Sequence, residues 1–314
     1  MIELSNVSKL FDQTRAVDDI SLTVPTGELC VLVGTSGCGK STTLRMINRL
    51  ITHSAGSIRI NGRDIEQIDP QQLRRGIGYA IQSTGLFPHW TVARNIAVVP
   101  RLLGWPTARV RQRVEELLQL LELAPAEFAD KYPRQLSGGQ AQRVGVARAL
   151  AGDPDILLMD EPFGALDPIT RESLQNELLR IQQQVRKTIV FVTHDMDEAL
   201  KLANRIVVMD KGRIVQQDSP QALLAKPANA FVENLLGGQE RGLKQAGLLR
   251  VDSLMQALAT AAIPAAGPAL KVTDSLRQAL SLMLWHRRSS LPVVDAQGLQ
   301  VGVLQLDALM SRPQ

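Results

Sequence analysis

Apolar and polar side chains alternate through residues 2–7 and 17–24, and a polar segment at 12–14 separates the two. This alternation around a polar turn predicts an antiparallel β-hairpin. Continuous apolar runs follow at 29–33, 156–159 and 189–192. Such runs are typical of strands buried on both faces of a parallel sheet. The pattern therefore predicts an α/β fold that combines a parallel sheet with an antiparallel portion.

Helical periodicity replaces the strand pattern between about residues 87 and 150. The segments 91–99 and 107–121 are both compatible with helices, and a third helix is expected after Ser137. The second has an apolar stripe at helical spacing: Val110, Val114, Leu117, Leu118 and Leu121. We interpret this region as a helical insertion in the parallel-sheet domain. The bulky loop at 86–90, Leu-Phe-Pro-His-Trp, is either core or an apolar surface for a partner.

The first buried strand runs directly into a glycine-rich loop. Residues 34–41 read Gly-Thr-Ser-Gly-Cys-Gly-Lys-Ser and are followed by a helix-compatible run to Leu50. A strand, G-x-x-x-x-G-K-S and a helix in this order form the phosphate-binding loop pattern, in which backbone N–H groups and the helix dipole hold phosphates. Lys40 is expected to reach the β- and γ-phosphates, and Ser41 to ligate Mg²⁺. Cys38, beside Lys40 at a helix N-terminus, is expected to favour the thiolate.

Polar residues also follow the other buried strands. Asp160 and Glu161 end one strand, where Asp160 is placed to hold Mg²⁺ and Glu161 to polarise an attacking water. His194 follows another strand and is expected at a γ-phosphate or an attacking water. Gln82 ends the apolar segment 77–82, where an amide can contact a metal or water. These positions together predict a nucleotide site at one edge of the sheet.

Two further features have two readings each. Ser137-Gly-Gly-Gln140 begins the third helix, and is either an ordinary N-cap or a second anion site. Phe11, at the turn of the first hairpin, either stacks on a purine or plugs an apolar gap.

Composition limits the class of protein. A length of 314 residues suits two domains, and 45% apolar with 21% charged residues is ordinary for a globular protein. No apolar run approaches the ~18–20 residues that cross a bilayer, and no secretory leader opens the chain, so we expect a cytoplasmic protein. The two cysteines have no metal spacing and imply no disulfide framework. With 4% aromatic residues and no basic-aromatic interleaving, nucleic-acid binding is not supported.

In this order, the motifs resemble those of the ATP-binding subunit of ABC transporters, over residues 1 to about 236. The resemblance implies a P-loop NTPase fold with an antiparallel β subdomain and a helical subdomain at about 87–150. It implies binding of ATP and Mg²⁺ by a head-to-tail dimer of two copies. It assigns catalysis to Glu161, His194, Lys40 and Gln82, and the metal to Ser41, Gln82 and Asp160. The implied nucleotide-binding set is Phe11, Gly34, Thr35, Ser36, Gly37, Cys38, Gly39, Lys40, Ser41, Thr42, Gln82, Ser137, Gly138, Gly139, Gln140, Asp160 and Asp167.

The implied dimer explains why one chain carries two anion sites. Ser137, Gly138 and Gly139 of one copy would cap the γ-phosphate held by the other copy. Asp167, in Gly-Ala-Leu-Asp at 164–167, would couple the two sites across the interface.

The segments 79–92 and 46–50 are similar to those of importers of quaternary-amine osmoprotectants, such as glycine betaine and choline. The implied partners are transmembrane permease subunits and, through them, a periplasmic or lipid-anchored substrate-binding protein. The implied location is the cytoplasmic face of the inner membrane, and in this family the region 82–90 lies near the groove that receives a permease helix. The alternatives are an importer of an amino acid, methionine or another small solute, a soluble ABC ATPase, and a non-enzymatic nucleotide sensor.

The tail from about residue 241 lies outside the ATPase pattern. A predicted amphipathic helix at 274–283, strands at 291–295 and 301–304, and a helix start at 307 resemble one cystathionine-β-synthase (CBS) repeat, a small α+β unit at 267–314. Residues 237–266 are expected to be a linker or a degenerate first repeat, with 248–263 compatible with a helix. The resemblance leaves two roles open, a dimerising scaffold and a regulatory sensor.

Charge generates a prediction about this tail. Residues 241–314 contain eight Lys or Arg and four Asp or Glu, so the tail either faces an anionic partner such as lipid or is an ordinary solvated face that is basic. On the first reading, salt would screen the attraction to lipid beyond about 8–10 Å. Deleting residues 241–314 is expected to change the salt dependence of solute uptake while leaving basal ATPase activity intact. Uptake by reconstituted vesicles across a salt series tests this hypothesis, and an unchanged salt profile contradicts it.

Overall fold

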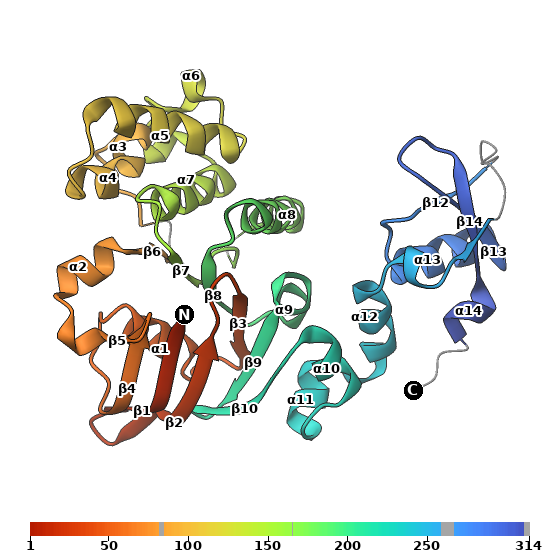
Figure 1. The fold of residues 1–314 in the computed structure, drawn as a ribbon, viewed down its shortest axis with the longest axis horizontal. Helices are drawn as coiled ribbons and strands as arrows, with labels where there is room; N and C mark the ends of the chain where they lie inside the picture. Colours follow the sequence, from red (N-terminus) through yellow and green to blue (C-terminus); the bar gives the residue numbers. More distant parts are fainter. Residues whose placement is uncertain (82–84, 165, 259–266, 311–314) are drawn as a thin grey trace. The chain divides into compact units, whose positions relative to one another are not determined.

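The computed structural model describes residues 1–81, 85–164, 166–258 and 267–310, and the chain divides into two compact units, Met1–Ser219 and Pro220–Gln314 (Figure 1). Among the described residues, the first unit contains two sheets and the second unit one, and each unit has its own apolar core. Within the described residues, no helix is both long enough and apolar enough to span a bilayer.

The antiparallel sheet of the first unit contains the predicted hairpin. Its strand order is β2-β1-β4-β5, with β1 at Ile2–Phe11, β2 at Thr14–Val24, β4 at Ala55–Ile60 and β5 at Arg63–Asp64. The predicted polar turn joins β1 to β2, and an Asn61-Gly62 turn joins β4 to β5. The apolar positions of the hairpin, such as Ile2, Leu4 and Val17, are buried.

The second sheet of this unit has the order β10-β9-β3-β8-β7-β6. Its strands are β3 (Leu29–Gly34), β6 (Ile77–Ala80), β7 (Ile156–Asp160), β8 (Thr188–Thr193), β9 (Arg205–Asp210) and β10 (Arg213–Asp218). All neighbours are parallel except β9 and β10, which form a hairpin. Helix α1 (Lys40–Ile47) packs in one core with side chains from both sheets. The α/β fold predicted from the apolar runs is confirmed.

The predicted helical insertion contains α3 (Val92–Ile96), α4 (Val98–Leu102), α5 (Thr107–Leu120), α6 (Pro125–Phe128) and α7 (Gly138–Leu150). The apolar stripe predicted on α5 is buried. The segment expected to be helical at 91–99 contains two short helices divided at Ala97, and the second extends to Leu102. Pro100 lacks the N–H that would donate to the Ile96 carbonyl, which explains the break. Before this insertion lie η1 (Ile65–Gln67) and α2 (Pro70–Arg75), and after it α8 (Pro168–Val185) and α9 (Met196–Leu202).

The second unit begins with α10 (Pro220–Ala225), α11 (Ala230–Leu235), η3 (Gly238–Glu240) and α12 (Arg241–Leu248). A sheet of order β11-β14-β13-β12 follows, with β11 at Gln256–Ala257, β12 at Leu270–Lys271, β13 at Ser290–Val294 and β14 at Gln300–Gln305. The predicted helices are present as α13 (Leu276–His286) and α14 (Leu306–Met310). Contacts thus group residues from 220 onward together, whereas the domain boundary at 236 stays a prediction.

The helix expected across 248–263 was wrong for its described part. Beyond Leu248, where α12 ends, the chain forms a 3₁₀ turn, η4 (Val251–Ser253), and then the short strand β11. Val251 is fully buried in the same core as Leu276, and the Val251 N–H donates to the Asp274 carbonyl at 2.8 Å. Tertiary contacts therefore use the backbone groups that a helix would need. Residues 259–263 lie outside the described part of the chain.

Candidate functional site

The register of the parallel sheet brings the predicted site residues to one edge. Val33 pairs with Thr193 between β3 and β8, and Asp160 pairs with Val192 between β7 and β8. The glycine-rich loop after β3, Glu161 after β7 and His194 after β8 therefore leave the sheet side by side. Carboxyl ends of parallel strands are where α/β sheets bind ligands.

The glycine-rich loop is folded tightly against neighbouring backbone. Gly34 has a φ of 153°, and a Cβ there would lie 2.1 Å from the Met209 carbonyl oxygen. Gly39 has a φ of 104°, and a Cβ there would lie 2.6 Å from the Ala16 carbonyl oxygen. Gly39 also precedes α1 without any side-chain cap, and the first turn of α1 has no acidic residue. This leaves the positive end of α1 directed at the loop, as anion binding requires.

Lys40 reaches back across this loop. Its buried ammonium donates to the carbonyls of Gly34 at 2.9 Å and Thr35 at 2.8 Å. These two bonds hold the positive charge inside the loop, beside the exposed residues Thr35, Ser36 and Gly37.

The expected thiolate at Cys38 was wrong. The side chain is 2% exposed, and burial raises the pKa of the Cys38 thiol. Lys40, whose ammonium lies 3.7 Å from the sulfur, acts in the opposite direction but does not outweigh desolvation. The sequence pattern indicated the positive charge of Lys40 and the N-terminus of α1, but it did not indicate that the Cys38 thiol is buried.

Ser41 and Asp160 form the predicted metal pair. The Ser41 hydroxyl donates to Asp160 Oδ1 at 2.7 Å, and Asp160 is 6% exposed. A hydroxyl and a carboxylate are hard oxygen donors of the kind that Mg²⁺ takes together with phosphate oxygens, so the pair fits this ion. Among the described residues, His, Cys, Asp and Glu form no cluster of three that would hold a metal by themselves. The third predicted metal contact, Gln82, lies outside the described residues.

Glu161 and His194 face each other across the site. Glu161 Oε2 lies 3.2 Å from His194 Nδ1, and the Glu161 N–H donates to the Val192 carbonyl at 3.0 Å. Glu161 adopts a φ of 45°, an uncommon conformation for a residue with a side chain. This contact places a carboxylate and an imidazole together at the phosphate loop.

A cavity of about 510 Å³ joins these parts. Its lining residues are Ser36, Gly37, Gly39, Lys40, Ser41, Thr42, Glu161 and His194. Phe11 is 44% exposed but is not among them, so its stacking role stays a prediction. The arrangement can bind a polyphosphate and direct a water molecule at its end.

The second predicted anion site stands apart from this cavity. Ser137 caps α7 by accepting from the Gln140 N–H at 3.3 Å, and the Gln140 side chain accepts from the Ser137 N–H at 2.9 Å. Neither residue, nor Gly138 or Gly139, belongs to the lining set given above. The structure therefore does not bring this tetrapeptide to the phosphate loop of the same chain.

The same tetrapeptide lies beside the start of α8. A Cβ on Gly139 would be 2.5 Å from Thr170 Cγ2, so a larger residue here would require the Thr170 side chain to move. The Thr170 N–H donates to Asp167, the exposed N-cap of α8, at 3.1 Å, and hydrogen bonds from Thr170 lower the pKa of the Asp167 carboxyl. The two elements expected to meet a second copy thus share one surface.

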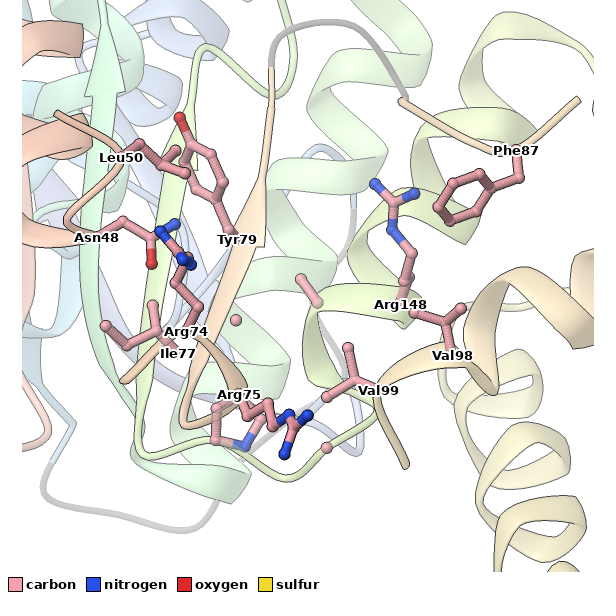
Figure 2. Close-up of a pocket in the computed structure, with 14 residues that line it drawn as sticks. Asn48, Leu50, Arg74, Arg75, Ile77, Tyr79, Phe87, Val98, Val99 and Arg148 are labelled. Carbon is pink, nitrogen blue, oxygen red and sulfur yellow. The ribbon is translucent and has the colours of Figure 1, made fainter. Parts of the chain in front are cut away.

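Sequence reasoning missed most of a groove between the sheet and the helical insertion. This cavity, of about 500 Å³, is shown in Figure 2, where Tyr79, Asn48 and Arg74 lie across from Arg148 and Phe87. Arg148 donates to the Gly85 carbonyl at 2.6 Å, and burial lowers its pKa. Only the aromatic loop was predicted, because the arginines come from helices that the sequence does not place together.

The aromatic loop beside this groove is held rigidly. Asn95 is fully buried, and its Oδ1 accepts from the Phe87 N–H at 2.8 Å. Its amide donates to the carbonyls of Phe87, Trp90 and Thr91 at 3.2, 3.2 and 3.0 Å. Phe87 is nevertheless 40% exposed, with its ring centroid 4.5 Å from that of Trp90. Of the two readings of this loop, core and surface, Phe87 fits the surface.

Comparison with known proteins gives three findings. A family model described as ABC transporter matches residues 17–164. The chain is 51% identical over 310 residues to the glycine betaine uptake system ATP-binding protein YehX of Escherichia coli K12, covering 99% of both chains. It is 47% identical to the glycine betaine/carnitine/choline transport ATP-binding protein OpuCA of Bacillus subtilis 168, covering 98% of this chain and 79% of that one.

A solved structure also matches the chain. It is a dimeric post-hydrolysis state of an ATP-binding cassette bound to ADP and Pi. The match has a TM-score of 0.64 at 34% identity and covers 70% of this chain and 99% of the other.

Burial of Cys38 predicts low thiol reactivity. Iodoacetamide at neutral pH is expected to modify native Cys38 at least about tenfold more slowly than the same thiol in denaturant, because the thiolate is both scarce and covered. Mass spectrometry of the peptide that contains Cys38, sampled over time, measures both rates. Equal rates in the native and denatured protein would show that the thiol is accessible.

Proposed function

This chain belongs to the ABC transporter family, and from that premise we propose that it is the ATP-hydrolysing subunit of an importer for a quaternary-amine osmoprotectant, such as glycine betaine or choline. The observation that carries the proposal is the 51% identity to a glycine betaine uptake subunit over 99% of both chains. The identity extends through the C-terminal unit, so it covers more than the ATP-binding motifs.

The residues at the sheet edge have separate roles in this reaction. The phosphate loop binds the ATP phosphates, and Lys40 neutralises charge on the β- and γ-phosphates. Ser41 and Asp160 would hold Mg²⁺, which would neutralise charge that develops on the phosphate oxygens. Glu161 orients a water molecule and accepts its proton as the water oxygen attacks the γ-phosphorus and ADP leaves. His194, 3.2 Å from Glu161, orients that carboxylate and contacts the γ-phosphate.

Each site is completed by a second copy of the chain. The exposed Ser137 and Gly138, with Gly139 and the Ser137 cap on α7, bind the γ-phosphate held by the partner, where hydroxyl and N–H donors suit an oxyanion. Asp167, on the same surface, contacts the partner near its nucleotide. The dimeric cassette with ADP and Pi, similar over 70% of this chain, supports this assembly.

The groove in Figure 2 is the docking site for a helix of a permease subunit. It combines exposed Phe87 and apolar Val98 and Val99 with arginines at 74, 75 and 148, so it suits an amphipathic helix with acidic or carbonyl groups at one end. Through the permease, the chain is peripheral to the cytoplasmic face of the membrane and receives solute from an external substrate-binding protein.

Removing the Glu161 carboxylate tests hydrolysis. Glu161→Gln is expected to lower the rate of phosphate release by about 10²–10⁴-fold, because the amide cannot accept a proton, while ATP binding and ATP-dependent dimerisation persist. Phosphate release, calorimetry and size-exclusion chromatography measure the three properties. Glu172→Gln on the exposed side of α8 is the matched control, and this variant is expected to hydrolyse ATP normally.

A transport assay tests the identity of the solute. Vesicles that contain this subunit, the permease and the substrate-binding protein are expected to take up labelled glycine betaine. If such vesicles take up only a different solute, the proposal is contradicted.

Truncating the aromatic loop tests the docking site. Phe87→Ala and Trp90→Ala are expected to lower solute uptake by about tenfold or more, since loss of an aromatic anchor commonly costs 2 kcal/mol or more at an interface. ATP binding by the isolated subunit is expected to persist. Phe87 lines the groove, and Trp90 packs against Phe87. Trp105→Ala is the control, because Trp105 lies outside the aromatic loop and the groove lining, where its ring stacks with Arg109 at 3.7 Å. If ATP binding falls in parallel with uptake, the side chains belong to the core.

A further inference from the structure

A polar bridge joins the first turns of α8 and α9. Helix α8 starts directly after Asp167, and α9 starts directly after Asp195, which follows His194. Asp167 lies on the surface assigned above to the second copy, whereas His194 contacts Glu161. The bridge therefore lies between a dimer-facing loop and the catalytic pair.

Arg171 contacts both of the segments that precede these helices, the one before α8 and the one before α9. Its Nη2 donates to the Leu166 carbonyl at 3.2 Å, and its Nη1 lies 3.6 Å from Asp195 Oδ2. Asp195 follows His194 directly, and its other carboxylate oxygen accepts from the N–H groups of Asp197 and Glu198, which caps α9. One guanidinium thus touches the residue before Asp167 and the residue after His194.

A second contact lies one turn deeper along both helices. Gln175 and Glu198 are 7% and 6% exposed, and the Gln175 amide donates to the Glu198 carboxylate at 2.9 Å. Gln175 follows Arg171 by four residues and Glu198 follows Asp195 by three, so both contacts lie on the same faces of α8 and α9. A side-chain hydrogen bond also links Glu198 to Thr193, the residue before His194.

Packing alone does not require these polar groups. Apolar residues of the same two helices, Leu174, Leu178 and Ala199, are also buried, and an apolar pair of similar size would fill the place of Gln175 and Glu198. A buried hydrogen-bonded pair has directional requirements, because either partner left unpaired costs about 1–3 kcal/mol. The bridge therefore permits one alignment of the two helix starts, where an apolar contact would permit several.

We propose that Arg171, Gln175 and Glu198 are positioning residues that fix His194 relative to Leu166 and Asp167, so that docking of the second subunit at Asp167 is transmitted to His194 in the same chain. The inference rests on the proposed ATPase function and on the dimer assigned there. The bridge makes hydrolysis at one site depend on the arrival of the other subunit.

Kinetics of three variants test the proposal. Arg171→Ala is expected to lower kcat about tenfold and to reduce the Hill coefficient for ATP to about one, with KM changed less than about twofold, since coupling residues typically modulate interactions over this range. Arg171→Lys, which can keep one of the two contacts, is expected to recover part of kcat. The double variant Gln175→Leu with Glu198→Leu removes both buried partners together, so the melting temperature is expected to hold while cooperativity falls.

The control is Arg180→Ala. Arg180 lies on the same helix, pairs with Glu177 and donates to the Leu120 carbonyl, so it loses the same kinds of contact without touching either segment. The proposal is overturned if the Arg171 and double variants keep wild-type kcat and cooperativity, or if their kinetics change only as much as those of Arg180→Ala.

Hydrogen exchange separates this inference from the proposed function. ATP is expected to protect amides at 166–171 and 194–198 together in the wild type, and to protect only one of the two segments in Arg171→Ala. A wild type that exchanges in this way without hydrolysing ATP would overturn the ATPase proposal alone. Independent protection of the two segments in the wild type would overturn the bridge.

Discussion

The pairing of β8 with β3 on one side and β7 on the other is the constraint on which the site depends. Three functional segments far apart in sequence leave the sheet at one edge only because Val33 pairs with Thr193 and Asp160 with Val192. A shift of one residue in either register would reverse the faces of the buried strands and move Glu161 away from His194. Every side chain on these strands is buried, including the polar residues Asp160, Thr188 and Thr193 at the strand ends. A shift would therefore also separate these three side chains from their hydrogen-bond partners.

The sequence predicted this edge well because each component is local. A buried run followed by a glycine-rich loop or by two carboxylates identifies both the strand and its functional end, and Ser41, Asp160, Glu161 and His194 meet as the motifs indicate. Prediction failed where the answer depends on contacts distant in sequence. Burial outweighs the neighbouring ammonium at Cys38, and tertiary hydrogen bonds prevent a helix after Leu248.

The missed residues share the same cause. Arg171 follows Asp167 by four residues, so its proximity to the loop before α8 was within reach of sequence reasoning. Its contact with Asp195 was not, because the packing of α8 against α9 has no signature in the sequence. Arg148 and the groove are similar, since α7 and the strand β6 meet only in the folded chain.

The clamp that Asn95 makes on the aromatic loop has a consequence for the speed and specificity of assembly. Three hydrogen bonds join Asn95 to the backbone of Phe87 and Trp90, and a fourth joins it to the adjacent Thr91. Conformational entropy lost on folding in this way does not oppose later association. In the docking role proposed above, such a surface would select its partner by shape instead of adapting to several. Permeases whose docking helices differ in shape would then need ATPase subunits whose aromatic loops differ. Asn95 and the rings of Phe87 and Trp90 would therefore limit the exchange of ATPase subunits between related importers.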